Sequence, residues 1–157
     1  MKNSFSKGIL SFILFFALVL LSITILIGFG SLIPQIISEF SLIKLFGVIL
    51  NLIYLLNYAI VAKYLLNLIK TTETTPFIIE NVKRFRIMGY CLIYNSIFEC
   101  IMGYSGNNVG NIQILATSHG AITVPMIICF LSALMCFVMA EIFDKAIKIK
   151  TENDLTI

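Results

Sequence analysis

The sequence predicts an all-α fold, a four-helix transmembrane bundle with both termini in the cytoplasm. Three observations lead to this prediction: the composition, four long apolar runs, and the distribution of Lys and Arg. Of the 157 residues, 59% are hydrophobic and only 12% are charged, whereas soluble domains carry about a quarter charged residues. One small domain could not hide so much apolar surface from water. The composition excludes an ordinary soluble protein, and we treat residues 1–157 as a single integral membrane domain.

The first two spans are predicted at residues 9–28 and 45–62. A helix needs about 20 mainly apolar residues to cross the hydrocarbon core of a bilayer. The first run contains no charge and is not followed by a small-x-small cleavage site, so we expect it to stay attached rather than act as a signal peptide. Lys44 and Lys63 flank the second run, and their long stems can carry both charges to the interface.

A short interfacial helix and a third span are predicted next. Thr75 and Pro76 are suited to the N-cap and the first helical position. Residues 76–86 would then form a helix with apolar and charged faces, lying near the lipid headgroups on the cytoplasmic side. The third span, residues 87–104, is shorter than the others, which favours a tilted helix or local thinning of the bilayer.

For the last part of the chain, the sequence predicts an uncharged outer loop, a fourth span and a cytoplasmic tail. The loop covers residues 105–119 and the span residues 121–140. Pro125 is compatible with the first turn of this helix or with a kink deeper inside it. Residues 141–157 form the tail, whose first part we expect to extend the helix to residue 150. Two acid-before-base pairs at i,i+4 spacing support the extension: Glu141 with Lys145, and Asp144 with Lys148.

Positive charge sets the orientation, because Lys and Arg in short loops are retained on the cytoplasmic side. One side of the predicted bundle carries all but one of these residues, namely Lys2, Lys7, Lys63, Lys70, Lys83, Arg84, Arg86, Lys145, Lys148 and Lys150. Only Lys44 lies opposite, so both termini are placed in the cytoplasm. The net charge of +3 then reflects orientation signals, which could also favour anionic lipid. We expect no direct binding of nucleic acid, because no soluble domain remains to form a basic groove.

Glu99 is the most informative polar residue, because an acid inside a membrane helix is costly unless it is neutral or partnered. We expect it to face the protein interior at the depth of Asn51, one turn from Asn95. Further possible neighbours are Tyr54, Ser22 and Thr24. One interpretation is an intramembrane switch, responsive to protons or cations, or a ligand-binding group formed by Glu99, Asn95 and Asn51. The other is a neutral, hydrogen-bonded packing residue.

The sequence suggests no metal site, cofactor site or catalytic site, and we do not expect an enzyme. Cys91 and Cys100 are nine residues apart, so they fall on opposite faces of one helix. The remaining cysteines, Cys129 and Cys136, form no C-x-x-C pair with them, and His119 is the single histidine. We interpret the thiols as small apolar packing groups. His119 could sense external acidity or simply be solvated in the outer loop.

Two motifs resemble a known family. Residues 75–86 read TPFIIENVKRFR and residues 152–157 read ENDLTI. They are similar to the motifs P-F-x-x-E-N-x-x-R-x-R and D-L-T-I of a bacterial membrane family, domain of unknown function 2975. Chain length and the plan of four spans agree with that family. Ala146 departs from it, because glycine is expected there. The resemblance implies a multi-pass protein of the bacterial cytoplasmic membrane, and members of the family are often encoded beside a small helix-turn-helix regulator.

The resemblance also implies candidate docking residues on the cytoplasmic face. These are Pro76, Phe77, Glu80, Asn81, Arg84, Arg86, Asp154, Leu155, Thr156 and Ile157. One hypothesis is that they bind a cytoplasmic regulator protein and that the chain is a regulatory or accessory partner. A simpler interpretation is that Glu80 pairs with Arg84 and the tail is solvated. The alternative function is a small transporter or channel component, or a membrane-protecting immunity-type protein. Transport would require a homo-oligomer, because four short-looped helices can hardly form a pore alone.

Overall fold

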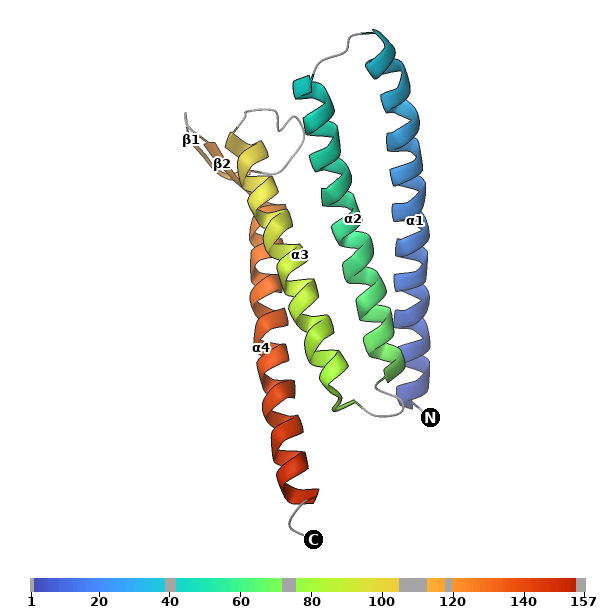
Figure 1. Cartoon of the computed structure of the whole chain (residues 1–157), viewed down its shortest axis with the longest axis vertical. Coiled ribbons are helices and arrows are strands. Elements are labelled where there is room, and N and C mark those ends of the chain that lie inside the picture. The colour runs from blue at the N-terminus through green and yellow to red at the C-terminus, as the bar shows by residue number, and fades with distance from the viewer. Residues whose placement is uncertain (1, 39–41, 72–75, 105–112, 118–119, 155–157) are drawn as a thin grey trace. The chain divides into compact units, whose positions relative to one another are not determined.

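The computed structural model of the chain contains four long helices and a short β-hairpin (Figure 1). It describes residues 2–38, 42–71, 76–104, 113–117 and 120–154. The elements in chain order are α1 (Lys2–Ser38), α2 (Leu42–Thr71), α3 (Ile79–Tyr104), β1 (Gln113–Thr117), β2 (Gly120–Thr123) and α4 (Val124–Asp154). The all-α, four-helix prediction is confirmed, with the hairpin as a small addition. The chain divides into two compact units, Met1–Ile69 and Lys70–Ile157.

Three of the described helices are long and apolar enough to cross a membrane. They are Lys7–Gly30, Leu45–Thr71 and Val124–Asp154, and each coincides with a predicted apolar run. Helix α3 is 26 residues long, about 39 Å at 1.5 Å per residue, but it is not among the three. Its length is sufficient, so its polar side chains are what set it apart.

The first unit contains α1 and most of α2, and two hydroxyl groups of α1 bond to their own helix. The hydroxyl groups of Ser22 and Thr24 donate to the carbonyl oxygens of Leu18 and Leu21, both at 2.8 Å. Large apolar side chains are exposed along α1. Hydroxyl groups that bond to their own helix can be placed in lipid without a second partner, because the polar atoms are already paired.

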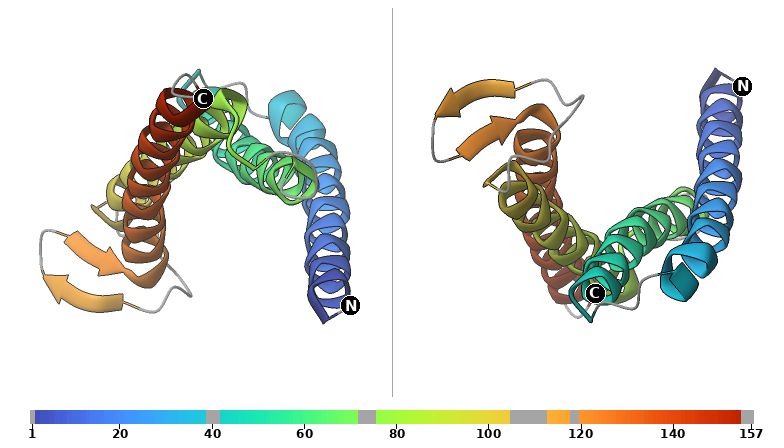
Figure 2. Two further views of the ribbon diagram at one scale, coloured as in Figure 1. Left: turned by 90° about the horizontal axis from the view of Figure 1, so that it is seen from below. Right: turned by 90° about the horizontal axis from the view of Figure 1, so that it is seen from above.

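The second unit is built on α3 and α4, which lie side by side and antiparallel, with the hairpin at the end where α4 begins (Figures 1 and 2). Its apolar core is formed by Val82, Met88, Leu92 and Phe98 of α3 and by Cys129, Ala133 and Ala140 of α4. The two helices approach closely at Gly89. A Cβ atom added there would lie 2.8 Å from the Phe137 ring, so glycine is needed for this ring to pack against the backbone of α3.

The β-hairpin was not predicted, and it shifts the start of the fourth helix. Strands β1 and β2 are antiparallel, with Gln113 opposite Thr123 and Thr117 opposite Gly120. The fourth span was predicted from residue 121, but α4 begins at Val124. Pro125 therefore lies in the first turn, where its missing N–H costs little. The outer-loop residues 105–112 and His119 lie outside the described residues.

Two other predicted boundaries were wrong. Pro76 is not the first helical residue, because α3 begins at Ile79 and the Asn81 N–H donates to the Ile78 carbonyl oxygen at 3.0 Å. Residues 79–86 form the first turns of α3, which continues through the predicted span at residues 87–104. At the other end, α4 continues through Thr151 to Asp154, beyond the expected end of the helical extension at residue 150.

Candidate functional site

One exposed face of α3 changes from charged to apolar along its length. Its first part carries Glu80, Lys83 and Arg86, all exposed. The same face then continues at helical spacing with exposed apolar and aromatic side chains, which are Ile87, Tyr90, Ile97 and Ile101. Residues three and four apart lie on one side of a helix. The change between residues 86 and 87 therefore marks a boundary between a polar and an apolar surface.

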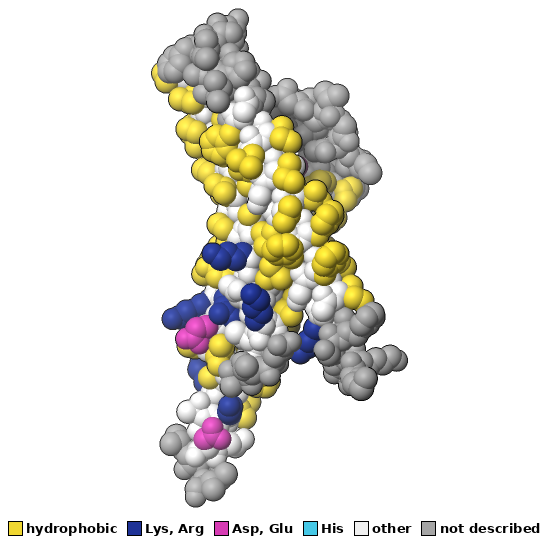
Figure 3. All heavy atoms as spheres, turned by 90° about the vertical axis from the view of Figure 1, so that its right-hand side faces the viewer, with side chains coloured by type: hydrophobic (Ala, Val, Ile, Leu, Met, Phe, Trp, Pro, Cys, Tyr) yellow, Lys and Arg dark blue, Asp and Glu magenta, His cyan; other side chains and the backbone are white. Residues whose placement is uncertain are grey.

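Helix α4 shows the same change in the reverse direction. Its exposed residues up to position 138 are large and apolar, namely Ile128, Phe130, Leu131, Leu134, Met135 and Val138. From Glu141 onward charged side chains predominate. Figure 3 draws the whole chain from another side, and on the face that it shows hydrophobic side chains gather in the upper part and Lys and Arg side chains in the lower part.

The two boundaries lie at the same level of the helical hairpin, the antiparallel pair formed by α3 and α4. Phe85 of α3 packs against Phe143 of α4, with ring centroids 5.4 Å apart, and Tyr90 packs edge-on against Phe137 at 5.2 Å. Residues 86–87 therefore lie level with the region around Glu141. The antiparallel helices α3 and α4 thus change from charged to apolar surface in one plane, as expected of a helical hairpin that enters a bilayer.

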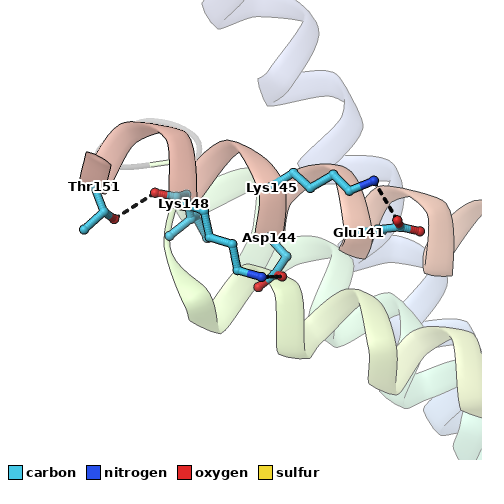
Figure 4. A network of polar contacts seen from close by, with 6 residues as sticks. Glu141, Asp144, Lys145, Lys148 and Thr151 are labelled. Atoms are coloured by element: carbon cyan, nitrogen blue, oxygen red, sulfur yellow. Dashed lines mark hydrogen bonds and ion pairs between the residues drawn. The ribbon is translucent and has the colours of Figure 1, made fainter. Parts of the chain in front are cut away.

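Ion pairs stabilise the charged end of α4, as the spacing predicted. Lys145 Nζ lies 2.8 Å from Glu141 Oε1, and Lys148 Nζ lies 3.0 Å from Asp144 Oδ2 (Figure 4). The Thr151 hydroxyl donates to the Ile147 carbonyl oxygen at 2.8 Å. These contacts support the continuation of the helix after its apolar part ends, although exposed ion pairs add little to stability.

Asn81 is the centre of a hydrogen-bond cluster at the beginning of α3. Its side chain is fully buried, at 0% exposure. Its Nδ2 donates to the Pro76 carbonyl oxygen at 2.8 Å, and its Oδ1 accepts from Thr71 Oγ1 at 3.0 Å and from Arg84 Nη1 at 2.8 Å. Arg84 also donates to Thr71 Oγ1 at 3.3 Å. This Asn81 cluster (Thr71, Pro76, Asn81, Arg84) ties both ends of the connection before α3 to the helix itself.

The motif that carries the family resemblance therefore contains two kinds of residue. Asn81 and Arg84 are engaged within the chain, so their role in this structure is to hold the connection. Glu80 and Arg86 are exposed, and Phe77 is 47% exposed although its ring packs on Phe143 at 5.7 Å. The exposed members are the ones that remain available to a partner.

Of the terminal D-L-T-I motif, residues 154–157, the structure describes only the first residue. Asp154 is exposed and is the last residue of α4. Leu155, Thr156 and Ile157 lie outside the described residues, so their predicted docking role stays a prediction.

Glu99 is buried, at 8% exposure, and contacts the beginning of α4. The Thr123 hydroxyl donates to Glu99 Oε2 at 3.4 Å and accepts the Met126 N–H at 3.3 Å. Thr123 therefore caps α4 in the usual N-cap position, three residues before Met126. One turn earlier on α3, the Ser96 hydroxyl donates to the Met126 carbonyl oxygen at 3.1 Å. Ser96 and Glu99 together anchor the first turn of α4.

The position of Glu99 suits a carboxyl group. The N-terminal end of a helix carries a partial positive charge, which favours an acid nearby. Glu99 lies about 18 Å along α3 from Ile87, at 1.5 Å per residue. A change in the charge of this carboxyl group would alter the hydrogen bond that Thr123 donates, and so would act directly on the cap of α4.

The residues that the sequence predicted near Glu99 lie in different surroundings. Asn95, one turn away on α3, is fully buried, as expected of a polar residue that faces the protein interior. Asn51 belongs to the first unit and is exposed, and its predicted proximity to Glu99 stays a prediction. Tyr54, another expected neighbour, packs edge-on with Tyr58, with their hydroxyl oxygens 3.2 Å apart.

Sequence reasoning missed the residue that contacts Glu99 most directly. Thr123 precedes Val124 and Pro125, and a Thr followed by Pro in the first turn is a recognised signal for a helix start. The same signal was assigned to Thr75 and Pro76 instead. Thr71 was missed for another reason, since nothing in its local sequence indicates contact with a residue ten positions later.

The thiols show no arrangement for metal binding in the part of the chain that the structure describes. The four cysteines form no disulfide bond, and no three His, Cys, Asp or Glu side chains gather there in a way that could hold a metal ion.

Comparison with known proteins identifies the family. No curated protein and no solved structure matches the chain. The model of a family described as Protein of unknown function (DUF2975) matches residues 8–157, which is nearly the whole chain and includes the Asn81 cluster, Glu99 and Thr123. The chain therefore belongs to the DUF2975 family.

Proposed function

We propose that the chain is a multi-pass protein of the bacterial cytoplasmic membrane that acts as a regulatory or accessory partner. In this proposal the boundary on α3 and α4 lies at the cytoplasmic surface of the membrane. The charged end of the helical hairpin binds a soluble regulator, such as a small helix-turn-helix protein. The common level of the two boundaries supports the placement in a membrane. The excess of Lys and Arg at that end supports the orientation. The proposal includes no catalytic step.

The division of the motif into buried and exposed residues is the observation that carries the docking proposal. Asn81 and Arg84 fix the connection before α3 through the hydrogen bonds of the Asn81 cluster. The same short segment presents Phe77 and Glu80 to solvent. A fixed backbone that displays an aromatic ring beside a carboxylate is suited to binding a protein, because little conformational entropy is lost when the partner binds.

Glu99 is the candidate switch within this proposal. Its carboxyl group accepts a hydrogen bond from Thr123, the residue that caps α4, and α4 continues without a break to its charged end. A change at Glu99 could therefore alter the position of α4 and with it the docking surface.

Affinity capture from membranes in mild detergent tests the docking proposal. The variant Phe77→Ala with Glu80→Gln removes two of the exposed motif side chains and leaves the residues of the Asn81 cluster unchanged. We expect it to recover a soluble regulator at least ten-fold less efficiently than the unmodified chain, about the effect of losing 1.4 kcal/mol of binding free energy. A second variant, lacking residues 154–157, tests the terminal motif in the same way.

The matched control is Glu141→Gln with Lys145→Gln. It removes an exposed ion pair at the same end of the helical hairpin but changes no residue of the motif. It should recover the regulator as well as the unmodified chain. Equal recovery by the Phe77 and Glu80 variant, or no regulator recovered with the unmodified chain, would contradict the docking proposal.

A further inference from the structure

The exposed face of α3 combines two cations with a long apolar surface. Lys83 and Arg86 are exposed one turn apart, directly before the apolar part of the face, which consists of Ile87, Tyr90, Ile97 and Ile101. We propose that this face is a binding site for one anionic phospholipid of the adjoining leaflet. Its phosphate lies against Lys83 and Arg86, and an acyl chain lies along the apolar part. This inference rests on the proposed placement in a membrane but not on the docking of a regulator.

The geometry of a helix directs the polar groups toward one level. Side chains on an α-helix lean toward its N-terminus, which for α3 is the charged end. Lys83 and Arg86 therefore extend toward the headgroup region. Tyr90 is 65% exposed, and its ring is held edge-on against Phe137. Tyrosine is enriched at membrane interfaces, and Tyr90 follows Arg86 by one helical turn.

Charge explains why the site is on α3 rather than on α4. The two lysines of α4 nearest its apolar part are paired, since Lys145 and Lys148 lie within 3.0 Å of the carboxylates of Glu141 and Asp144. Lys150 is exposed but lies farther along α4 from the apolar part. On α3 the acid of the same face is Glu80, which precedes Lys83 by three residues and lies farther from the apolar boundary. Two cations against one carboxylate leave a net positive charge that complements a phosphate.

The length of the apolar part favours a lipid over a free phosphate. From Ile87 to Ile101 the face extends about 21 Å at 1.5 Å per residue, which is within one hydrocarbon core of about 30 Å. A free phosphate or a soluble phosphate ester would use only the two cations. A phospholipid uses both the cations and the apolar part.

Native mass spectrometry of the purified full chain, taken from vesicles of phosphatidylcholine with and without phosphatidylglycerol, measures lipid retention directly. We expect phosphatidylglycerol to be retained in preference to phosphatidylcholine. Each cation near a membrane surface contributes about 1 kcal/mol, roughly five-fold in affinity. The variant Lys83→Gln with Arg86→Gln should therefore bind phosphatidylglycerol with an affinity about twenty-five-fold lower than that of the unmodified chain. Soluble glycerol phosphate should not displace the bound lipid.

The matched control replaces two lysines that are already paired. Lys145→Gln with Lys148→Gln removes the same formal charge and should change phosphatidylglycerol retention less than two-fold, because each lysine shares its charge with a carboxylate. An equal loss in both variants, unchanged retention in the α3 variant, or displacement by glycerol phosphate would overturn the proposed site. Failure of the chain to enter vesicles at all would instead contradict the membrane placement itself.

Discussion

Replacing Asn81 with leucine is expected to lower the free energy of unfolding by about 3 kcal/mol, because a buried polar group that loses its partner costs about 1–3 kcal/mol and a charged one costs more. Leucine has the same number of side-chain heavy atoms, in the same branched arrangement, but cannot hydrogen-bond. The substitution leaves the Pro76 carbonyl oxygen, the Thr71 hydroxyl and the Arg84 guanidinium without the partner that joins them. Unfolding of the reconstituted protein by sodium dodecyl sulfate in mixed micelles measures this change.

Two further variants separate the parts of the Asn81 effect. Asn81→Asp keeps an acceptor for Arg84 and Thr71 but loses the donor to Pro76, so its loss should be intermediate. Glu80→Gln changes the exposed neighbour and should stay within about 0.5 kcal/mol of the unmodified chain. If Asn81→Leu were no more destabilising than Glu80→Gln, the cluster would have no structural role and the motif would need another explanation.

Replacing Thr123 with valine is expected to cost about 2–3 kcal/mol. Valine has the shape of threonine but lacks the hydroxyl group, so the Met126 N–H loses its acceptor and the buried Glu99 loses the hydrogen bond that Thr123 donates. Loss of an N-cap alone costs about 0.5–2 kcal/mol, and loss of this buried hydrogen bond adds about 1 kcal/mol. Thr123→Ser keeps the hydroxyl and should be nearly neutral. The same unfolding measurement in mixed micelles applies.

Thr151 provides the control for this substitution. It lies on the same helix, is exposed, and its hydroxyl donates to its own helix, so Thr151→Val should change stability by less than about 0.5 kcal/mol. Combining Thr123→Val with Glu99→Gln should give a coupling of at least about 0.5 kcal/mol. Strictly additive effects would show that Glu99 and Thr123 act independently, and would remove the support for a switch that acts through the cap of α4.

The helices could be predicted from the sequence because each is a long apolar run or follows a clear helical period. The ion pairs of α4 were also predictable, since Glu141 and Lys145 are neighbours on any α-helix. These are local properties that do not depend on how the chain folds back on itself. The start of α3 was placed three residues too early, because Pro76 is compatible with a first helical turn but also with the non-helical residue that the structure shows.

Contacts between distant residues account for what the sequence did not predict. Thr123 is one partner of Glu99, and the pairing depends on the register of α3 against α4, which hydrophobic periodicity alone does not determine. The hairpin of β1 and β2 has strands of five and four residues, too short to show a reliable alternation. The close approach at Gly89 likewise depends on where Phe137 falls along the facing helix.

Labelling with a membrane-impermeant maleimide tests the membrane placement most directly. In a chain whose four native cysteines are replaced by alanine, single cysteines are introduced at Lys83, Lys148, Ile97 and Met135. We expect Lys83→Cys and Lys148→Cys to react only when the reagent reaches the cytoplasmic side. Ile97→Cys and Met135→Cys should react from neither side. Reaction of the first pair from outside intact cells, or of the second pair in sealed membranes, would contradict the boundary proposed for α3 and α4.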